Sequence, residues 1–168
     1  MYETPEDVSC LQRLLDESHA SMGEHMRNIL TPDRRLPAAR VIVALQGLKL
    51  LSLATVNRHG EPRVGPVDGL FYRGRFWFGS SPDAARFRHI RARPAVSATH
   101  LDCERFAVTV HGTAVTVDAT EESMAGFRNL LVEVYGERWW REVGAPAQFA
   151  VIEPRRMYTY FTGNSVSD

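Results

Sequence analysis

The chain has 168 residues, the size of one ordinary domain. Hydrophobic residues make up 44% of the sequence and charged residues 24%, so the chain can bury a core and has the composition of a globular protein. Its 20 basic and 20 acidic side chains cancel, which argues against a nucleic-acid-binding protein because such proteins carry a basic excess. A binding site for an anion must therefore be local.

We expect neither a membrane span nor a secretory signal. No stretch of the sequence approaches the roughly 20 apolar residues that cross a bilayer. The first residues include Glu3, Glu6 and Asp7, whereas a secretory signal starts with basic residues followed by an apolar run. In such a chain Cys10 and Cys103 are expected to be free thiols, and the protein is expected to be cytoplasmic.

Residues 1–47 predict a helical extension ahead of a β-rich domain at residues 48–168. Apolar residues spaced by three, four and seven predict a helix over residues 5–30. These residues are Val8, Leu11, Leu15, Met22, Met26 and Ile29. A second helix is expected over residues 37–46, with Gly47 as its end. The extension either packs over the following domain or extends a dimer interface.

From Leu48 onward the pattern changes to that of strands. A short apolar run at residues 50–56 predicts a buried strand, and a turn separates it from an extended segment at residues 62–72. Pro66 interrupts that segment and predicts an edge position or a bulge, because proline cannot donate to a ladder. An aromatic strand at residues 75–79 follows a tight turn, so the three strands form an antiparallel meander.

The rest of the chain alternates two helices with four strands. A helix is expected over residues 83–91, with serine as its cap, and another over residues 120–135. Gly112 predicts a bulge or a sharp bend. The strands are expected at residues 95–101, 105–117, 149–153 and 156–161. Six or seven short strands with few helices between them predict a mainly β fold with flanking helices, a closed antiparallel barrel.

The strand that ends at Gly79 leads into a possible anion site. Ser80 and Ser81 offer hydroxyl donors, and the following helix offers free backbone N–H groups at its N-terminus. Arg86 lies one turn into that helix, and Arg63 on the neighbouring strand could reach the same place. The same residues also fit an ordinary serine cap beside solvated arginines, so both interpretations stay open.

A second feature is the run Val64, Gly65, Pro66 and Val67. A planar ring needs a flat backbone wall with N–H and C=O groups at its polar edge, and glycine lets the chain come close. The alternative is a bulged edge strand without a ligand.

The order and spacing of four segments resemble the pyridoxamine 5′-phosphate oxidase-like split-barrel flavoproteins. The segments are residues 53–67 (LATVNRHGEPRVGPV), 76–82 (FWFGSSP), 85–86 (AR) and 94–97 (PAVS). The likeness covers roughly residues 48–118. It implies a six-stranded antiparallel split β-barrel that pairs as a homodimer, with cofactors at the subunit interface. Members of this family use FMN, coenzyme F420 or, in some branches, haem.

The resemblance also implies roles for individual residues. Arg63, Ser80, Ser81 and Arg86 would hold the cofactor phosphate, and residues 64–67 would line the ring. Two departures from the family pattern matter. The chain lacks the C-terminal R-L-H-D-R-type element of true pyridoxamine-phosphate oxidases, so vitamin B6 oxidation is not expected. One arginine stands where the family has a basic pair, and Arg88 could assist it.

Two functions remain open on this resemblance. One is an oxidoreductase that passes hydride or electrons to a small-molecule substrate through FMN or coenzyme F420. The other is a non-catalytic flavin- or haem-binding carrier or sensor, or a barrel that has lost its ligand. Hydride chemistry would belong to the cofactor ring, so no catalytic side chain is predicted. Haem, which is less expected, would require a histidine such as His111, although the favoured explanation of that residue is a hydrogen-bonded barrel histidine.

Three further groups of residues could take part in binding. An open groove of Arg86, Arg88, Arg91 and Arg93 would suit the oligoglutamate tail of F420. The adjacent Trp139 and Trp140 either close the pocket from the partner subunit or divide between the core and an interface. No metal site is expected, because nothing completes the cluster of residues 100–104, which holds His100, Asp102, Cys103 and Glu104.

Overall fold

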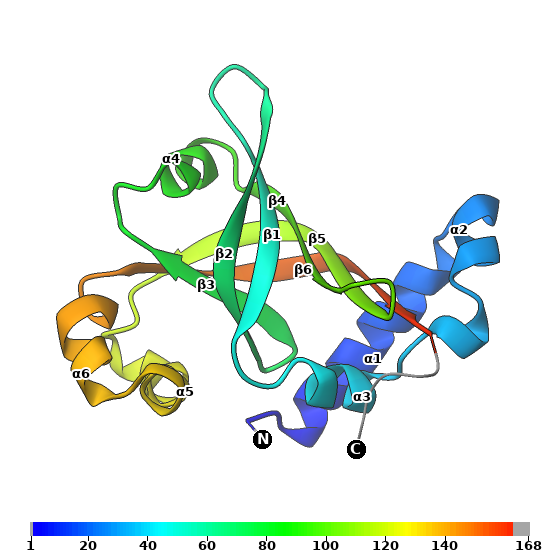
Figure 1. Cartoon of the computed structure of the whole chain (residues 1–168), viewed down its shortest axis with the longest axis horizontal. Coiled ribbons are helices and arrows are strands. Elements are labelled where there is room, and N and C mark those ends of the chain that lie inside the picture. Colours follow the sequence, from blue (N-terminus) through cyan, green and yellow to red (C-terminus); the bar gives the residue numbers. More distant parts are fainter. Residues whose placement is uncertain (1, 163–168) are drawn as a thin grey trace.

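The computed structural model describes residues 2–162. Within these residues, six antiparallel strands form a closed barrel in the order β1-β2-β3-β6-β5-β4 (Figure 1). The strands are β1 (Lys49–Val56), β2 (Pro62–Tyr72), β3 (Arg75–Ser80), β4 (Ala95–Asp102), β5 (Phe106–Val117) and β6 (Gln148–Phe161). The predicted mainly β fold with an antiparallel six-stranded barrel is thereby confirmed.

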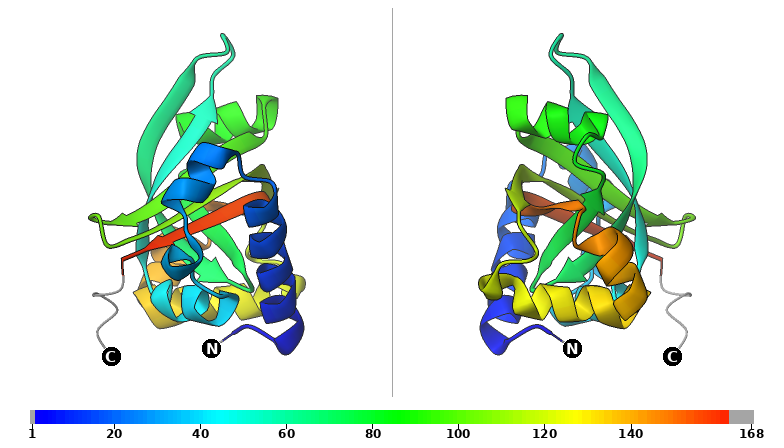
Figure 2. Two further views of the ribbon diagram at one scale, coloured as in Figure 1. Left: turned by 90° about the vertical axis from the view of Figure 1, so that its right-hand side faces the viewer. Right: turned by 90° about the vertical axis from the view of Figure 1, so that its left-hand side faces the viewer.

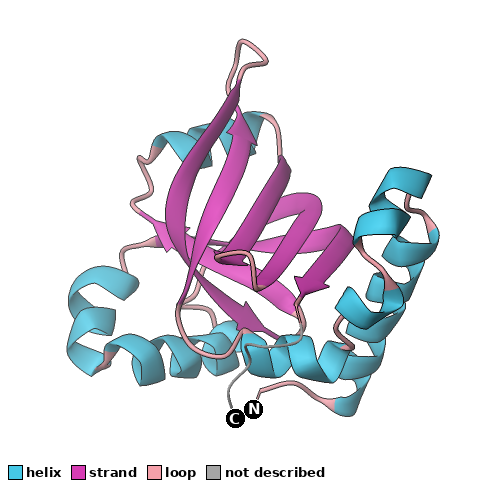
Figure 3. Cartoon of the chain, turned by 45° about the vertical axis from the view of Figure 1, so that its right-hand side comes forward, coloured by secondary structure: helices cyan, strands magenta, loops and turns pink. Residues whose placement is uncertain are grey.

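The helices lie around the barrel in three groups. They are α1 (Pro5–Ala20), α2 (Glu24–Ile29), α3 (Ala38–Ala44), α4 (Ala85–Ala92), α5 (Ala125–Tyr135) and α6 (Glu137–Trp139), with short turns η1 (Pro32–Arg34), η2 (Glu122–Met124) and η3 (Trp140–Gly144). Helices α1 to α3 lie on one side of the barrel, while α5 and α6 lie together on another (Figures 1 and 2). In Figure 3, strands β1 and β2 face the viewer with no helix in front of them.

The single helix predicted over residues 5–30 is wrong, because the chain breaks it at Ser21–Gly23. A capping box between Thr4 and Asp7 starts α1, which ends at Ala20. Gly23 is extended and precedes α2; glycine inside a helix costs about 1 kcal/mol relative to alanine. The apolar spacing continues beyond the break, but Met26 and Ile29 are exposed.

The N-terminal helices pack against β6. Strand β3 pairs with β6 only over Gln148–Val151, so the rest of β6 has a free edge on that side. Helix α1 covers it: the Met157 N–H donates to Ser18 Oγ at 2.9 Å, and the Leu36 N–H donates to Thr159 Oγ1 at 2.9 Å. Covering a free edge in this way satisfies its backbone groups. Leu15 of α1 belongs to the same hydrophobic cluster as the barrel interior.

The irregularity predicted at Gly112 is confirmed. The pairing of β5 with β6 shifts between His111 and Gly112, which lie opposite Arg156 and Pro154, so Arg155 is the extra residue. A Cβ atom at Gly112 would lie 2.2 Å from the Glu153 carbonyl oxygen. The two last strands predicted from the sequence, at residues 149–153 and 156–161, are one strand, because the chain stays extended through Pro154 and Arg155 at this bulge.

A second hydrophobic cluster lies between α5 and the outer faces of β3 and β6. Trp77 and Phe127 are its centre, with ring centroids 4.4 Å apart. Trp139 and Trp140 are both half-buried against this cluster within the same chain. Helix α5 begins later than predicted, because residues 122–124 form the short turn η2.

Two further features of the fold concern the cysteines and the helices. Cys10 and Cys103 are free and exposed, as the sequence predicted. Among residues 2–162, no helix is both long and apolar enough to cross a membrane.

Candidate functional site

The barrel is split between β2 and β3. These strands pair only over Gly69–Tyr72 and Arg75–Phe78, so the first half of β2 has β1 as its sole partner. Beyond Phe78, β3 pairs with β6 alone. Pro66 lies in the free half of β2, which confirms the edge position predicted for it. Divergence of the two strands leaves backbone groups and side chains accessible along one border of the barrel.

Arg86 of α4 reaches this free edge. Its Nη2 donates to the Pro66 carbonyl oxygen at 3.0 Å. Its Nη1 is buried, and among residues 2–162 it has no hydrogen-bond partner. Burial lowers the pKa of the Arg86 guanidinium from its ordinary value. A buried cationic donor without a partner is rare and calls for an explanation, and an anionic oxygen is the acceptor that suits it best.

The serine turn lies between β3 and α4. Ser80 is half-buried at the end of β3 and Ser81 is exposed. Neither hydroxyl forms a hydrogen bond within the described part of the chain, and both are therefore available to a ligand. The predicted serine cap is wrong: the Ala84 N–H donates to the Ser81 carbonyl at 2.9 Å and closes a turn. Helix α4 then begins with Ala84 as its cap, without a side-chain hydrogen bond.

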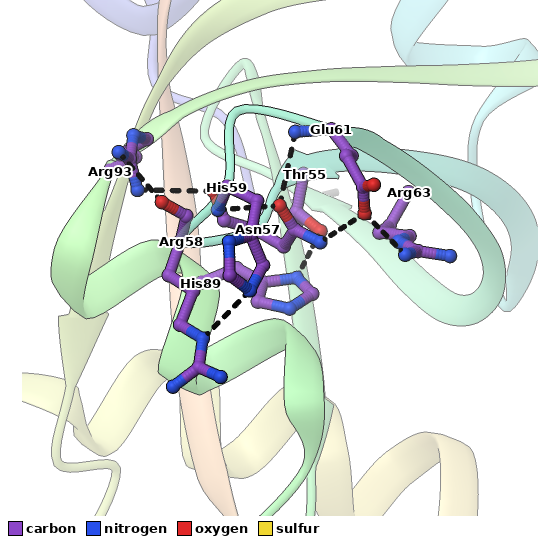
Figure 4. A network of polar contacts seen from close by, with 8 residues as sticks. All are labelled: Thr55, Asn57, Arg58, His59, Glu61, Arg63, His89 and Arg93. Atoms are coloured by element: carbon purple, nitrogen blue, oxygen red, sulfur yellow. Dashed lines mark hydrogen bonds and ion pairs between the residues drawn. The ribbon is translucent and has the colours of Figure 1, made fainter.

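Arg63 lies elsewhere, at the tip of the β1–β2 hairpin. Its Nη2 contacts Glu61 Oε2 at 2.6 Å, and Asn57 Nδ2 donates to the same oxygen at 2.7 Å (Figure 4). These hydrogen bonds, led by that from Asn57, hold the pKa of Glu61 below its ordinary value. No hydrogen bond within residues 2–162 joins Arg63 to Ser80 or Arg86. The structure thus engages Arg63 with the hairpin instead of the serine turn.

Of the other arginines in the expected groove, Arg88 and Arg93 donate to backbone carbonyls. Arg93 donates to the carbonyls of Asn57 at 3.0 Å and Arg58 at 3.2 Å and so ties the chain after α4 to the hairpin (Figure 4). Arg88 donates to the carbonyl of Asp83. Neither is therefore a free surface cation. Arg91 is exposed.

The run predicted as a ring wall is mostly open. Val64 is 71% exposed and Pro66 is exposed. A Cβ atom at Gly65 would meet no heavy atom within 4 Å, so the wall has free space in front of it. Val67 is buried, and only its backbone can face a ligand.

A cavity of about 500 Å³ opens beside the serine turn. One wall is Gly79, Ser80, Ser81 and Pro82, and Asp68 of β2 lies at its side. The opposite wall comes from the α5–η3 segment and β6. It consists of Phe127, Leu131, Tyr135, Trp139, Glu142, Val143, Pro146, Ala147 and Phe149. The sequence offered Trp139 as closing a pocket from the partner subunit, but it lines this cavity within its own chain. The other residues of this wall were not predicted.

The two histidines considered as ligands have protein partners. His100 Nδ1 lies 3.0 Å from the Leu50 carbonyl oxygen. His111 is exposed on β5, and its Nδ1 lies 2.7 Å from Ser97 Oγ. Residues 2–162 contain no group of three histidine, cysteine or acidic residues that could hold a metal ion.

The comparisons with known proteins agree with this geometry. The family model described as pyridoxamine 5′-phosphate oxidase matches residues 38–161. None of the curated proteins matches the sequence.

Several solved structures share the fold. HutZ, the haem storage protein from Vibrio cholerae, is 20% identical with a TM-score of 0.61, covering 76% of this chain and 95% of HutZ. A FAD-binding protein from Mesorhizobium loti is 21% identical with a TM-score of 0.59, covering 75% and 95%. A structure described as an F420 reductase is 21% identical with a TM-score of 0.53, covering 67% and 91%. At such identities the likeness shows the fold alone.

Proposed function

The chain belongs to the pyridoxamine 5′-phosphate oxidase family, and from this premise we propose that it is an oxidoreductase that binds FMN or coenzyme F420. It would pass hydride or electrons to a small molecule. The observation that carries the proposal is Arg86, whose buried Nη1 has no hydrogen-bond partner among the described residues and whose Nη2 donates to the split edge of the barrel. A cofactor phosphate would supply the missing acceptor.

The chain's own residues suit a flavin-type cofactor on this edge. Arg86 would bind a phosphate oxygen, and Ser80 and Ser81 would add hydroxyl donors that no protein group occupies. The open backbone at Gly65 and Pro66 would lie against the ring. Bound there, the cofactor would supply the redox chemistry, while the protein would orient it and shield one face. Arg63 would join the phosphate site only by leaving Glu61.

The structurally similar proteins support the proposal, but they do not decide which cofactor is bound. Their descriptions name FAD, F420 and haem as ligands. The free thiols Cys10 and Cys103 are consistent with a cytoplasmic protein, because that compartment keeps thiols reduced.

We also propose that the functional unit is a homodimer. Leu50, Val64 and Leu101 are 62%, 71% and 59% exposed, and the strand register places them on one outer face of β1, β2 and β4. Exposed apolar residues gathered on one face are typical of protein interfaces. Light scattering should give twice the chain mass, and Leu50→Asp should shift the protein towards monomer; a monomeric wild type would exclude the dimer.

The first experiment is a titration of the purified protein with FMN, F420 and haemin, followed by absorbance and tryptophan fluorescence. The proposal expects FMN or F420 to bind at micromolar concentration or below, about −8 kcal/mol. Arg86→Gln should weaken that binding on the order of ten- to a hundredfold, since a hydrogen bond to a charged group contributes about 1.5–3 kcal/mol.

Arg88→Gln is the matched control. It removes the same charge from the same helix, but Arg88 is exposed and bonded to the Asp83 carbonyl. Its cofactor affinity should stay close to that of the wild type. Absence of micromolar binding, or equal losses in both variants, would refute the assignment of Arg86.

A haem-binding carrier is the second candidate, and His111 is the observation that favours it. Ser97 fixes its Nδ1, and the ring is exposed on the sheet face. Such a partner orients an imidazole as a metal ligand. Haemin should then give a Soret band that His111→Ala removes and His100→Ala keeps. Flavin binding without haemin binding would exclude this candidate.

A further inference from the structure

The cavity beside the serine turn has an aromatic wall formed by residues of the same chain. Tyr135 and Trp139 stack with ring centroids 4.2 Å apart and an interplanar angle of 21°. Below them Phe127, Leu131 and Phe149 form a buried apolar floor. About 500 Å³ is within the range of small-molecule sites, so the cavity has room for a ring with a short substituent.

The charge of the cavity has one sign. Its charged lining residues are Asp68 and Glu142, and no lysine or arginine is among them. Glu142 already accepts from Arg138 Nε at 2.9 Å at the exposed rim. The Asp68 carboxylate has neither a hydrogen bond nor an ion pair to another described side chain. Asp68 is therefore a carboxylate beside an aromatic wall with nothing to balance its charge.

A second effect links Asp68 with the aromatic wall. Burial, and after it the charge of Asp68, raises the pKa of Tyr135 to about 12. The charge of Asp68 thus acts on Tyr135, and both residues line the cavity. An anionic ligand would be repelled there, whereas a cation would be attracted both by Asp68 and by the faces of the two rings.

We propose that this cavity binds a small organic cation, an ammonium group carried on an aromatic or apolar body. The body would lie on the apolar floor against Trp139, and the ammonium would lie between Asp68 and the aromatic faces. That this cation is the substrate of the enzyme, and not only a bound ligand, rests on the proposed function.

The serine turn separates this cavity from the anion site. Arg86 and the Pro66 carbonyl do not line the cavity. In Figure 1 the chain leaves the end of β3 and rises to α4, while α5 and α6 lie below. A phosphate-bearing cofactor on the α4 side and a cation on the α5 side would thus share the turn without competing for the same charges.

The test uses three probes of one shape in the full chain without added cofactor. They are phenethylamine as the cation, 2-phenylethanol as the neutral analogue and 3-phenylpropionate as the anion. Binding is followed by quenching of tryptophan fluorescence and by calorimetry. The amine is expected to bind about tenfold or more tightly than the carboxylate, an effect of about 1.4 kcal/mol.

Asp68→Asn should remove most of this preference. Asp68 is exposed, so the variant is expected to fold, which circular dichroism checks. Asp83→Asn is the matched control, because Asp83 is exposed on the adjacent turn but does not line the cavity. Tyr135→Leu should weaken all three probes. Equal affinity for amine and carboxylate, equal effects of the two asparagine variants, or no binding at all would overturn the proposal.

The outcome is independent of the cofactor titration. Arg86→Gln should weaken FMN or F420 and leave the amine affinity unchanged. Amine binding without any flavin binding would refute the proposed oxidoreductase but keep the cation site. Flavin binding with no preference for the amine would do the reverse.

Discussion

The two helical layers on the barrel differ in what they leave open. Helices α1 and α3 contribute residues such as Leu15 and Val41 to the same cluster as the barrel interior, and the layer closes the free edge of β6 through Ser18 and Thr159. The layer of α5, α6 and η3 packs on the barrel through aromatic residues and leaves a cavity of about 500 Å³ at its end. The first layer also has hollows, of about 510 Å³ beside Val8 and about 340 Å³ beside Asp7, but their lining residues are not aromatic, whereas the second layer forms a cavity with an aromatic wall.

The difference follows from side-chain shape and polar satisfaction. Small and branched aliphatic side chains interdigitate and exclude voids. Large rings such as Trp139 and Trp140 are only half-buried here, and Trp139 lines the same cavity as the serine turn. The apolar atoms that line an empty space lack dispersion contacts on that side, so the space lowers the stability of the fold.

The largest predicted effect compares one leucine from each layer. Leu15 is 0% exposed and Leu131 is 2% exposed. Leu15→Ala should lower the free energy of unfolding by about 3–5 kcal/mol, because it opens a sealed hole in the core. Leu131→Ala should cost less, about 2 kcal/mol, since it enlarges a cavity that solvent already reaches.

Urea unfolding followed by circular dichroism measures both losses. Unchanged slopes of free energy against urea would show that the two-state comparison holds. If Leu131→Ala costs as much as Leu15→Ala, the second layer is packed as core and the distinction between the layers fails.

The next effect concerns the polar seam of the first layer. Ser18 Oγ accepts from the Met157 N–H and donates to the Leu14 carbonyl, and Ser18 is fully buried. Ser18→Ala leaves a buried amide without an acceptor and should cost about 1–3 kcal/mol. Ser9→Ala is the control on the same helix, because exposed Ser9 donates only to the Pro5 carbonyl. Near-equal losses in the two variants would show that the seam at β6 is solvated.

The strands and the split edge could be predicted from the sequence, because both depend on local chemistry. Short apolar runs and turn residues located the strands, although β6 was predicted as two, and the absent N–H of Pro66 predicted an edge position or a bulge. The bulge at Gly112 was also predictable from a single residue, because only glycine fits that backbone. The family resemblance added the number of six strands and the split of the barrel.

The partners of the site residues could not be predicted, because they depend on how distant segments pack. Nothing local distinguishes Arg86, with its unpaired nitrogen, from Arg93, which binds the hairpin backbone. The pairing of Arg63 with Glu61 is an exception, since these residues lie two positions apart in the sequence. The aromatic wall of the cavity depends on α5 returning to β3, about 50 residues after that strand ends.

The smallest predicted effect is a pH dependence at His19, which lies on α1 over the barrel. Its Nε2 is buried without a partner among the described residues, and burial, followed by the charge of Arg35, lowers the pKa of the imidazole. A lowered folded-state pKa means that the unfolded chain binds the proton more readily. The contribution of His19 to stability is therefore complete above the ordinary histidine pKa of about 6.5 and is lost as the pH falls below it.

Urea midpoints at about pH 7.5 and about pH 5.5 lie on either side of that value. His19→Gln cannot take up the proton, so its midpoint should fall less between the two conditions than the wild-type midpoint does. His25→Gln, which replaces an exposed histidine of α2, should behave as the wild type. A wild-type fall that His19→Gln leaves unchanged would mean that water reaches the α1–β6 contact in the native state. The first layer would then resemble the second, and the contrast between a closed layer and an open one would not hold.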